Sequence, residues 1–189
     1  MRSFSNLLLH TQRLALRPLQ LQDAEQLYRI YSDPEFMRFW SSQPWSSLSQ
    51  ATELIERDIR ELAAGEHLRL GIFLVQDGSL IGTCSLFNLN EQCRRAEIGY
   101  GIASSHWRHG YMFEAVSAVI AFAFGELGMH RLEADIDPRN VGSARSLQKL
   151  GFASEGLLRE RWIVGQEVSD SALYGLLARE WRTSGRSAA

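Results

Sequence analysis

The sequence predicts an α/β (α+β) domain in which helices flank a mixed, strongly twisted central sheet of about seven strands. Alternating apolar residues indicate three consecutive strands in the middle of the chain, over 68–76, 79–89 and 94–102. A helix that is apolar nearly all round follows over 112–124, as is typical of a helix packed against a sheet. We expect the 189 residues to form a single domain over 1–182.

The first third of the chain is predicted to hold one strand and three helices. Leu14 and Leu16 alternate with their neighbours, which favours a strand that ends at Pro18. Apolar spacing and capping signals then predict a helix over 22–32, a short helix through Phe39, a loop over 41–49, and a helix from the capping box after Ser47 to Gly65.

The remaining elements follow from turn signals and alternation. Asp77-Gly78 predicts a hairpin between the first two central strands. After the apolar helix, the pattern predicts a strand over 130–137, a short helix over 143–150 with Gly151 just past its end, and two strands over 157–164 and 167–177 around Gly165-Gln166.

Composition excludes several classes of function. The net charge of −2 does not favour a nucleic-acid partner, and no apolar segment is long enough to suggest a membrane span. The two cysteines, Cys84 and Cys93, and the lack of a signal-peptide pattern predict a cytoplasmic protein. His106 and His109 lack a third ligand, so no metal site is predicted. Residues 183–189 are expected to form a disordered tail.

The strand over 94–102 carries an unusual face. Glu97, Gly99 and Gly101 share one side, which is nearly bare beyond the carboxylate. Glycines in a strand mark close approach either by a ligand or by a packed helix, and both readings stay open here.

The loop after this strand contains Arg108, His109 and Gly110 and leads directly into the apolar helix. Gly110 permits backbone N–H groups to converge, and the helix dipole adds positive potential, so a diphosphate would fit. A plain strand-to-helix connection is the alternative. Neither G-x-x-x-x-G-K-[ST] nor G-x-G-x-x-G occurs, which argues against ATP, GTP and the usual dinucleotide sites.

The segment 140–152 adds polar side chains. Asn140 or Ser143 can cap the helix that follows. Both can instead lie near the end of a bound ligand, where a serine hydroxyl can give a proton to a leaving group.

From residue 11 to residue 182 the chain resembles the GNAT superfamily of acyl-CoA-dependent N-acetyltransferases, in particular the branch with the ribosomal-protein N-terminal (alanine/serine) acetyltransferases. The resemblance rests on Thr11–Leu19, Glu97-Ile98-Gly99-Tyr100, Asn140-x-x-Ser143 and Lys149-Leu150-Gly151-Phe152. The family loop [Q/R]-x-x-G-x-[G/A] aligns with residues 107–112, where Gly110 matches, Trp107 replaces the polar position, and the bulkier Met112 replaces the small one.

This resemblance implies a GNAT-like fold in which the strands near 94–102 and 130–137 splay apart and hold acetyl-CoA. It implies pantetheine contacts from the backbone of Tyr100, Gly101 and Ile102 and from Asn140 and Ser143, and pyrophosphate contacts from the amides of Arg108, His109, Gly110, Tyr111, Met112 and Phe113.

The resemblance further implies direct attack of an amine on the thioester. Glu97 is expected to be the base, unless it is a surface residue paired with Arg94 or Arg95, and Ser143 is expected to be the acid, unless it only caps its helix. The N–H near Ile102 is expected to polarise the thioester carbonyl.

The acceptor is expected to be a protein or peptide N-terminal amine, as in the ribosomal-protein enzymes. A polyamine, amino acid or aminoglycoside acceptor is an alternative, and so is a non-catalytic acyl-CoA sensor. The mixed charges of residues 34–60 lean toward a peptide. Phe39, Trp40 and Trp45 are either core residues or part of the acceptor pocket, and a homodimer is compatible with the resemblance.

Overall fold

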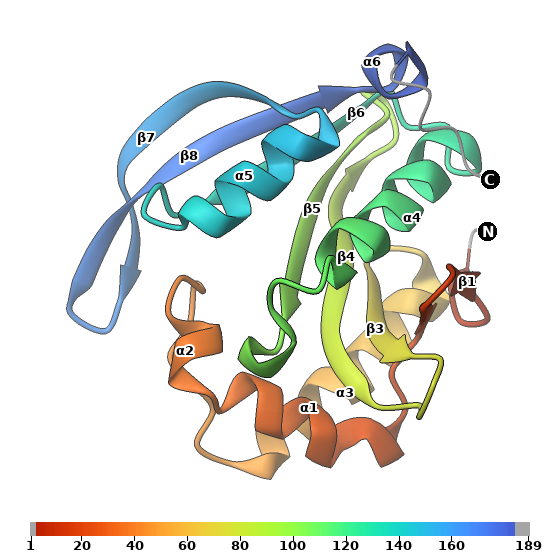
Figure 1. Cartoon of the computed structure of the whole chain (residues 1–189), viewed down its shortest axis with the longest axis vertical. Coiled ribbons are helices and arrows are strands. Elements are labelled where there is room, and N and C mark those ends of the chain that lie inside the picture. Colours follow the sequence, from red (N-terminus) through yellow and green to blue (C-terminus); the bar gives the residue numbers. More distant parts are fainter. Residues whose placement is uncertain (1–2, 184–189) are drawn as a thin grey trace.

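The computed structural model describes residues 3–183, which form an eight-stranded mixed sheet and six α-helices (Figure 1). The strands are β1 (Leu9–His10), β2 (Leu14–Arg17), β3 (Leu68–Leu74), β4 (Leu80–Asn90), β5 (Arg95–Ile102), β6 (Arg131–Ile136), β7 (Ala153–Val164) and β8 (Glu167–Leu177). The helices are α1 (Ala24–Tyr31), α2 (Pro34–Met37), α3 (Leu48–Ala64), α4 (Tyr111–Gly125), α5 (Val141–Leu150) and α6 (Ala178–Thr183).

The strand order is β1-β2-β3-β4-β5-β6-β8-β7. Every neighbouring pair is antiparallel except β5 and β6, which are parallel and connected through α4. The long β7–β8 hairpin projects away from the rest of the sheet (Figure 1). Strands β5 and β6 thus form the one parallel pair of the described sheet.

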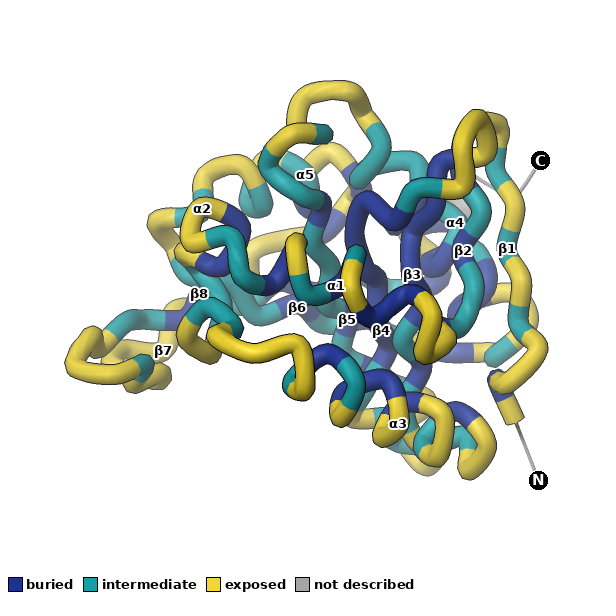
Figure 2. Tube along the Cα trace, turned by 90° about the horizontal axis from the view of Figure 1, so that it is seen from below, coloured by how far each residue is buried: buried dark blue, intermediate teal, exposed yellow. Residues whose placement is uncertain are grey.

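Helices cover both faces of the sheet. Helices α1 and α3 lie against one face, and α4 and α5 lie against the other (Figure 2). Two buried clusters result, a large one that includes α4 and α5 and a smaller one that includes α1 to α3. The buried residues are concentrated in the strands β3 to β5, whereas β7 is almost entirely exposed (Figure 2).

Local chemistry explains the element boundaries. Ser47 and Gln50 form the predicted capping box of α3, and Gly65 ends that helix in the left-handed conformation with φ 73°. Gly78 takes φ 72° in the predicted turn between β3 and β4, and Gly165 takes φ 64° between β7 and β8. These predicted turns are confirmed.

Some predicted elements need correction. The sheet has eight strands rather than seven, because Leu9 and His10 pair with β2, and two residues are too few for alternation to be detected. Strand β7 begins at Ala153 rather than near 157, because its exposed side chains give no apolar pattern. Helix α6 was not predicted. Thr183 belongs to it, and residues 184–189 of the predicted tail lie outside the described residues.

Within residues 3–183, no helix is long and apolar enough to cross a membrane.

Candidate active site

Strands β5 and β6 separate partway along their length. They pair at Arg95↔Arg131, Ala96↔Leu132 and Glu97↔Glu133, and in the described sheet β5 has no β6 partner beyond that point. Tyr100, Gly101 and Ile102 therefore present one backbone edge to an open wedge. This confirms the predicted splay near 94–102 and 130–137.

The loop beyond β5 leaves a run of backbone amides unpaired at the start of α4. Gly110 has φ 80° and directly precedes α4. The backbone N–H groups of five successive residues have no acceptor within residues 3–183; they belong to Arg108, His109, Gly110, Tyr111 and Met112. Unpaired amides at a helix N-terminus favour phosphate, so these residues fit the predicted pyrophosphate contact. Phe113 follows in the first turn of α4.

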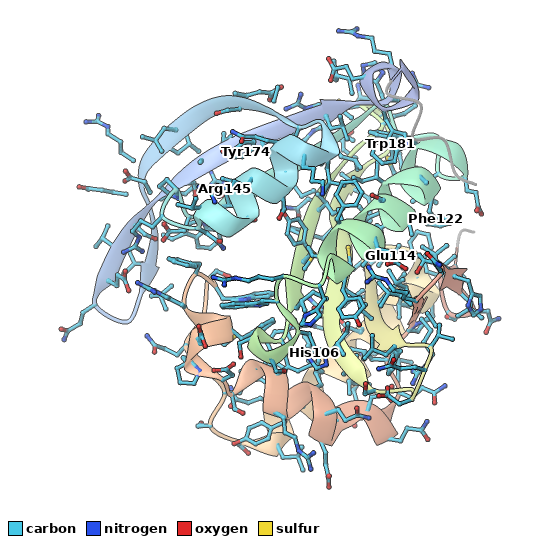
Figure 3. All side chains as sticks on the ribbon, in the orientation of Figure 1. His106, Glu114, Phe122, Arg145, Tyr174 and Trp181 are labelled. Atoms are coloured by element: carbon cyan, nitrogen blue, oxygen red, sulfur yellow. The ribbon has the colours of Figure 1, made fainter. Side chains whose placement is uncertain are left out.

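Arg13 contacts this loop and holds it in place. The sequence did not single out this residue. Its Nη1 donates to the His109 carbonyl (3.0 Å), and its Nε donates to Glu114 (2.7 Å). Its guanidinium also lies 4.6 Å from the centre of the Tyr111 ring. Glu114 lies on α4 (Figure 3) and also accepts a hydrogen bond from Thr11 Oγ1 at 2.6 Å. The Arg13 guanidinium thus lies beside the unpaired amides. The only sequence signal for Arg13 was its place in the segment Thr11–Leu19.

The two departures from the family loop have structural explanations. Trp107 Nε1 donates to the Ile102 carbonyl at 2.6 Å and so ties the loop to the end of β5. Met112 packs against the large buried cluster. Because the Ile102 carbonyl is engaged, any ligand contact at this residue falls to other backbone groups.

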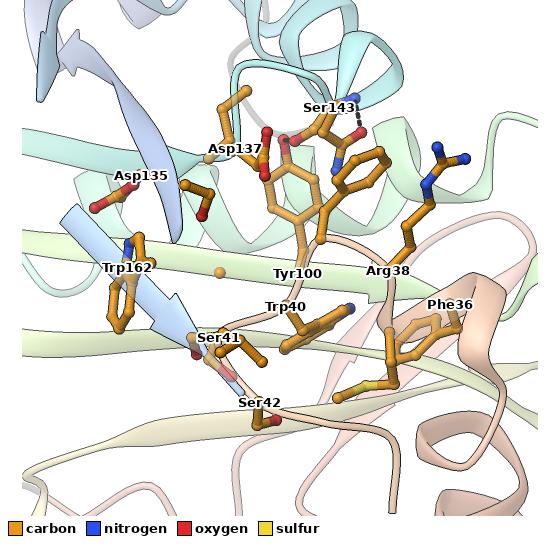
Figure 4. Close-up of a pocket in the computed structure, with 18 of the residues that line it drawn as sticks. Phe36, Arg38, Trp40, Ser41, Ser42, Tyr100, Asp135, Asp137, Ser143 and Trp162 are labelled. Carbon is orange, nitrogen blue, oxygen red and sulfur yellow. Dashed lines mark hydrogen bonds between the residues drawn. The ribbon is translucent and has the colours of Figure 1, made fainter. Parts of the chain in front are cut away.

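A cavity of about 690 Å³ lies where α2, β4, β5, β6, α5 and the β7–β8 hairpin meet (Figure 4). Glu97, Tyr100, Asn140 and Ser143 all line it. The structure therefore brings together side chains from β5 and α5 that the sequence had singled out separately.

Glu97 is half-buried and accepts a hydrogen bond from Asn88 Nδ2 (2.9 Å). Asn88 has φ 51° and sits in a bulge of β4, which turns its side chain toward β5. The alternative that Glu97 pairs with Arg95 is wrong, because Arg95 Nη1 binds Glu133 at 2.8 Å instead.

Tyr100 and Ser143 connect β5 to α5. Their hydroxyl oxygens lie 3.0 Å apart, and either can be the donor. Burial raises the pKa of Tyr100, so it stays a neutral phenol at physiological pH. Asn140 Oδ1 accepts from the Ser143 backbone N–H (3.0 Å), so Asn140 is the helix cap and the Ser143 hydroxyl is not needed for capping (Figure 4).

The two glycines on the bare face of β5, Gly99 and Gly101, have different surroundings. A Cβ on Gly101 would lie 2.7 Å from both Phe36 and Trp40, so α2 and the residues after it pack over Gly101. Gly99 lines the cavity. Phe39 and Trp40 also line the cavity, whereas Trp45 stacks on Tyr31 with ring centres 4.5 Å apart.

Four carboxylates line the cavity, and three of them contact an arginine, with Asp137 and Glu167 sharing one. Asp137 and Glu167 both pair with Arg139, and Arg161 Nε lies 3.0 Å from Asp135 Oδ2. Within residues 3–183, Glu97 is the only cavity carboxylate without a cationic partner.

The cysteines offer no reactive nucleophile near the cavity. Burial raises the pKa of the Cys84 thiol to about 12, and Cys93 is exposed in the turn before β5. Within residues 3–183, no three His, Cys, Asp or Glu side chains are arranged to hold a metal ion.

Comparisons with known proteins agree with this geometry. Residues 13–153 match the family described as "Acetyltransferase (GNAT) domain". The chain is 36% identical over 174 residues to the uncharacterized N-acetyltransferase p20 of Bacillus licheniformis, covering 92% of this chain and 97% of the relative. It is 27% identical over 153 residues to spermidine N(1)-acetyltransferase of Escherichia coli K12, covering 80% and 79%.

A solved structure described as a "putative ribosomal-protein-serine acetyltransferase" from Vibrio cholerae superimposes with a TM-score of 0.80. The sequence identity is 26%, and the match covers 94% of this chain and 99% of that one.

Proposed function

The chain belongs to the GNAT family of acetyl-CoA-dependent N-acetyltransferases, and we propose that its acceptor is the N-terminal amine of a protein or peptide. The observation that carries this proposal is that Glu97 alone, among the cavity carboxylates of residues 3–183, contacts no arginine. One carboxylate suits one ammonium group. A polyamine carries several positive charges along its length and would require several free carboxylates.

The residues present suit acetyl-CoA. The free amides of residues 108–112 would hold its pyrophosphate, with Arg13 adding positive charge beside them. The open edge of β5 at Tyr100 and Gly101 would pair with the pantetheine arm, and Asn140 and Ser143 lie close to the same wedge. When bound there, acetyl-CoA supplies an activated acetyl thioester.

Glu97 is proposed as the base. An ammonium must lose a proton before it can attack a thioester, and Glu97 takes this proton directly or through water. The Asn88 amide holds one carboxylate oxygen and leaves the other free to face the acceptor. Asn88 is thus a positioning residue for the base.

Ser143 is proposed as the acid. As the new C–N bond forms and the C–S bond breaks, the Ser143 hydroxyl gives its proton to the departing sulfur. Because a phenol is a better donor than an alcohol, we assign Tyr100 as the donor to Ser143 Oγ across 3.0 Å. The Ser143 hydrogen is then free to point into the cavity.

Thiol release with a panel of acceptors tests the proposal. The purified protein is mixed with acetyl-CoA and either peptides with free N-termini, the same peptides with blocked N-termini, spermidine, free amino acids or an aminoglycoside. We expect thiol release with the free peptides alone, with acetylation at the N-terminus by mass spectrometry. Preferential acetylation of spermidine would support a small-amine acetyltransferase. Tight binding of CoA with no release in any mixture would support the sensor.

The proposal includes a cytoplasmic site of action and a homodimer. Both cysteines are free thiols, as suits a reducing compartment. The β7–β8 hairpin exposes Trp162, Ile163 and Val168, which a second copy would cover. Sedimentation of the purified chain tests the dimer, since a monomer at micromolar concentration would contradict it.

A further inference from the structure

A row of three residues crosses the sheet beneath the cavity. Arg69 on β3 pairs with Ser85 on β4, and Ser85 pairs with Gly99 on β5. Direct cross-strand partners share one face of a sheet, and adjacent strands lie about 4.8 Å apart. All three residues line the cavity. Gly99 adds no side chain to this row, and the edge of the Phe87 ring lies 3.2 Å from the position that a Cβ would take there.

Arg69 is fixed at the inner end of this row. Its Nη1 donates to Asp58 Oδ1 at 2.5 Å, where Asp58 on α3 is only 1% exposed. A guanidinium has five N–H donors, and this bond uses one of them. The remaining donors have no acceptor within residues 3–183, although the Arg69 side chain is only 15% exposed.

Ser85 adds a second available group. It is buried, and its hydroxyl has no hydrogen-bond partner among the described residues. Since Asp58 balances the charge of Arg69, the inner end of the row presents hydrogen-bond donors with little net charge. Such a surface favours a neutral oxygen over an ammonium group.

The acceptor amine and this row lie close together. Glu97 lies two residues before Gly99 on the same face of β5. It therefore belongs to the cross-strand row next to the one that contains Ser85 and Arg69. An N-terminal residue with its amine at Glu97 would therefore direct a short side chain past the Phe87 ring toward the donors.

We propose that Arg69 and Ser85 form a subsite for the side-chain oxygen of the acceptor's first residue, and that the enzyme favours N-terminal Ser, Thr or Asn over apolar residues of the same size. This proposal rests on the peptide acceptor proposed above. An apolar side chain of equal volume would displace water from the donors without replacing its hydrogen bonds.

Peptides that differ only in their first residue test the subsite. A peptide that begins with Thr is compared with one that begins with Val, and a peptide that begins with Asn with one that begins with Leu. We expect kcat/KM to favour Thr and Asn by roughly 10- to 100-fold, the range for a hydrogen bond to a charged donor. In Ser85→Ala, and in the double variant Asp58→Asn with Arg69→Gln, the ratios should fall to within about 3-fold. The double variant avoids leaving a buried carboxylate unpaired, and circular dichroism verifies its fold.

Arg60→Gln, an exposed arginine on α3, is the matched control and should keep the wild-type ratios. Ratios near one in the wild type, or unchanged ratios in Ser85→Ala and the double variant, would overturn the subsite while leaving the peptide acceptor intact. Acetylation of spermidine with no peptide acetylated would overturn both proposals.

Discussion

Neighbouring side chains decide what each charged residue of the cavity can do. Glu97, Asp135 and Glu167 are chemically similar and line the same space, yet Asp135 and Glu167 each contact an arginine. Glu97 contacts an amide instead, which holds its position without cancelling its charge. The neighbouring side chains, and not the residue type, thus leave Glu97 without an ion-pair partner.

Replacing Glu97 tests its proposed role. Glu97→Gln should lower kcat by roughly 10²–10⁴-fold, since the amide cannot accept the acceptor's proton. Steady-state thiol release from pH 6 to 9 measures this, with Glu91→Gln, an exposed acid before β5, as the control. Asn88→Ala should give a smaller loss and change the pH profile. Equal turnover of Glu97→Gln and wild type across that range would remove Glu97 from the role.

His67 couples stability to pH. Burial, with Arg69 and Arg57 nearby, lowers the His67 pKa from 6.5 to about 4. Glu61 Oε2, 3.4 Å from Nδ1, opposes this shift, but at that distance it does not outweigh burial and two guanidinium groups. Between these pKa values the unfolded chain binds a proton that the folded chain does not. Stability should therefore fall as pH drops from 6.5 toward 4, by at most about 3 kcal/mol.

Urea unfolding at several pH values measures this loss of stability. His67→Phe should remove the component due to this residue, whereas His10→Gln, an exposed histidine, should retain it. The same pH dependence in His67→Phe and wild type would show that other groups are responsible.

At the scale of elements, helix α5 gives Asn140 and Ser143 different roles, which the sequence alone could not distinguish. Asn140 caps the helix through its side-chain oxygen, while Ser143 contributes only its backbone N–H to that cap and keeps its hydroxyl for Tyr100. Either residue type is a common N-cap, so the pattern Asn140-x-x-Ser143 could not assign the roles.

Two alanine variants of α5 should therefore differ in kind. Asn140→Ala should lower the free energy of unfolding by about 1 kcal/mol through loss of the cap. Ser143→Ala should change stability by less than about 0.5 kcal/mol but reduce kcat with little change in the KM for acetyl-CoA. Chemical unfolding and thiol-release kinetics measure the two effects. Normal turnover of Ser143→Ala would leave it no role as the acid.

At the scale of the whole molecule, parts of the chain that are distant in sequence surround the open wedge between β5 and β6. The loop at Gly110, the β5 edge and α5 come from different parts of the chain, and Arg13 near the N-terminus contacts the loop. A ligand that spans them should stabilise the folded state by mass action.

Acetyl-CoA at about 100 times its Kd should add about 2.7 kcal/mol of stability, which raises Tm by about 5–10 °C for a chain of this size. Differential scanning fluorimetry measures the shift. Acetyl-pantetheine at the same concentration is the matched ligand control and should give a smaller shift, because it lacks the pyrophosphate that the loop amides would bind. Equal shifts would argue against the loop as a phosphate site.

The sequence by itself determined the central strands, the apolar helix α4, the turns at Gly78 and Gly165, and the family. Those features are local, because alternation, capping residues and left-handed glycines act over a few neighbours. It did not reveal β1, whose two residues are held by pairing with β2.

Only the tertiary structure decided which cavity carboxylate contacts no arginine, which residue caps α5, and that Arg69 and Ser85 face the same cavity as Glu97. Arg69 and Glu97 lie 28 positions apart in the sequence and meet through the strand β4 between them. The physical reason is that ion pairs and cross-strand contacts depend on distances in space, which sheet pairing sets and residue spacing does not.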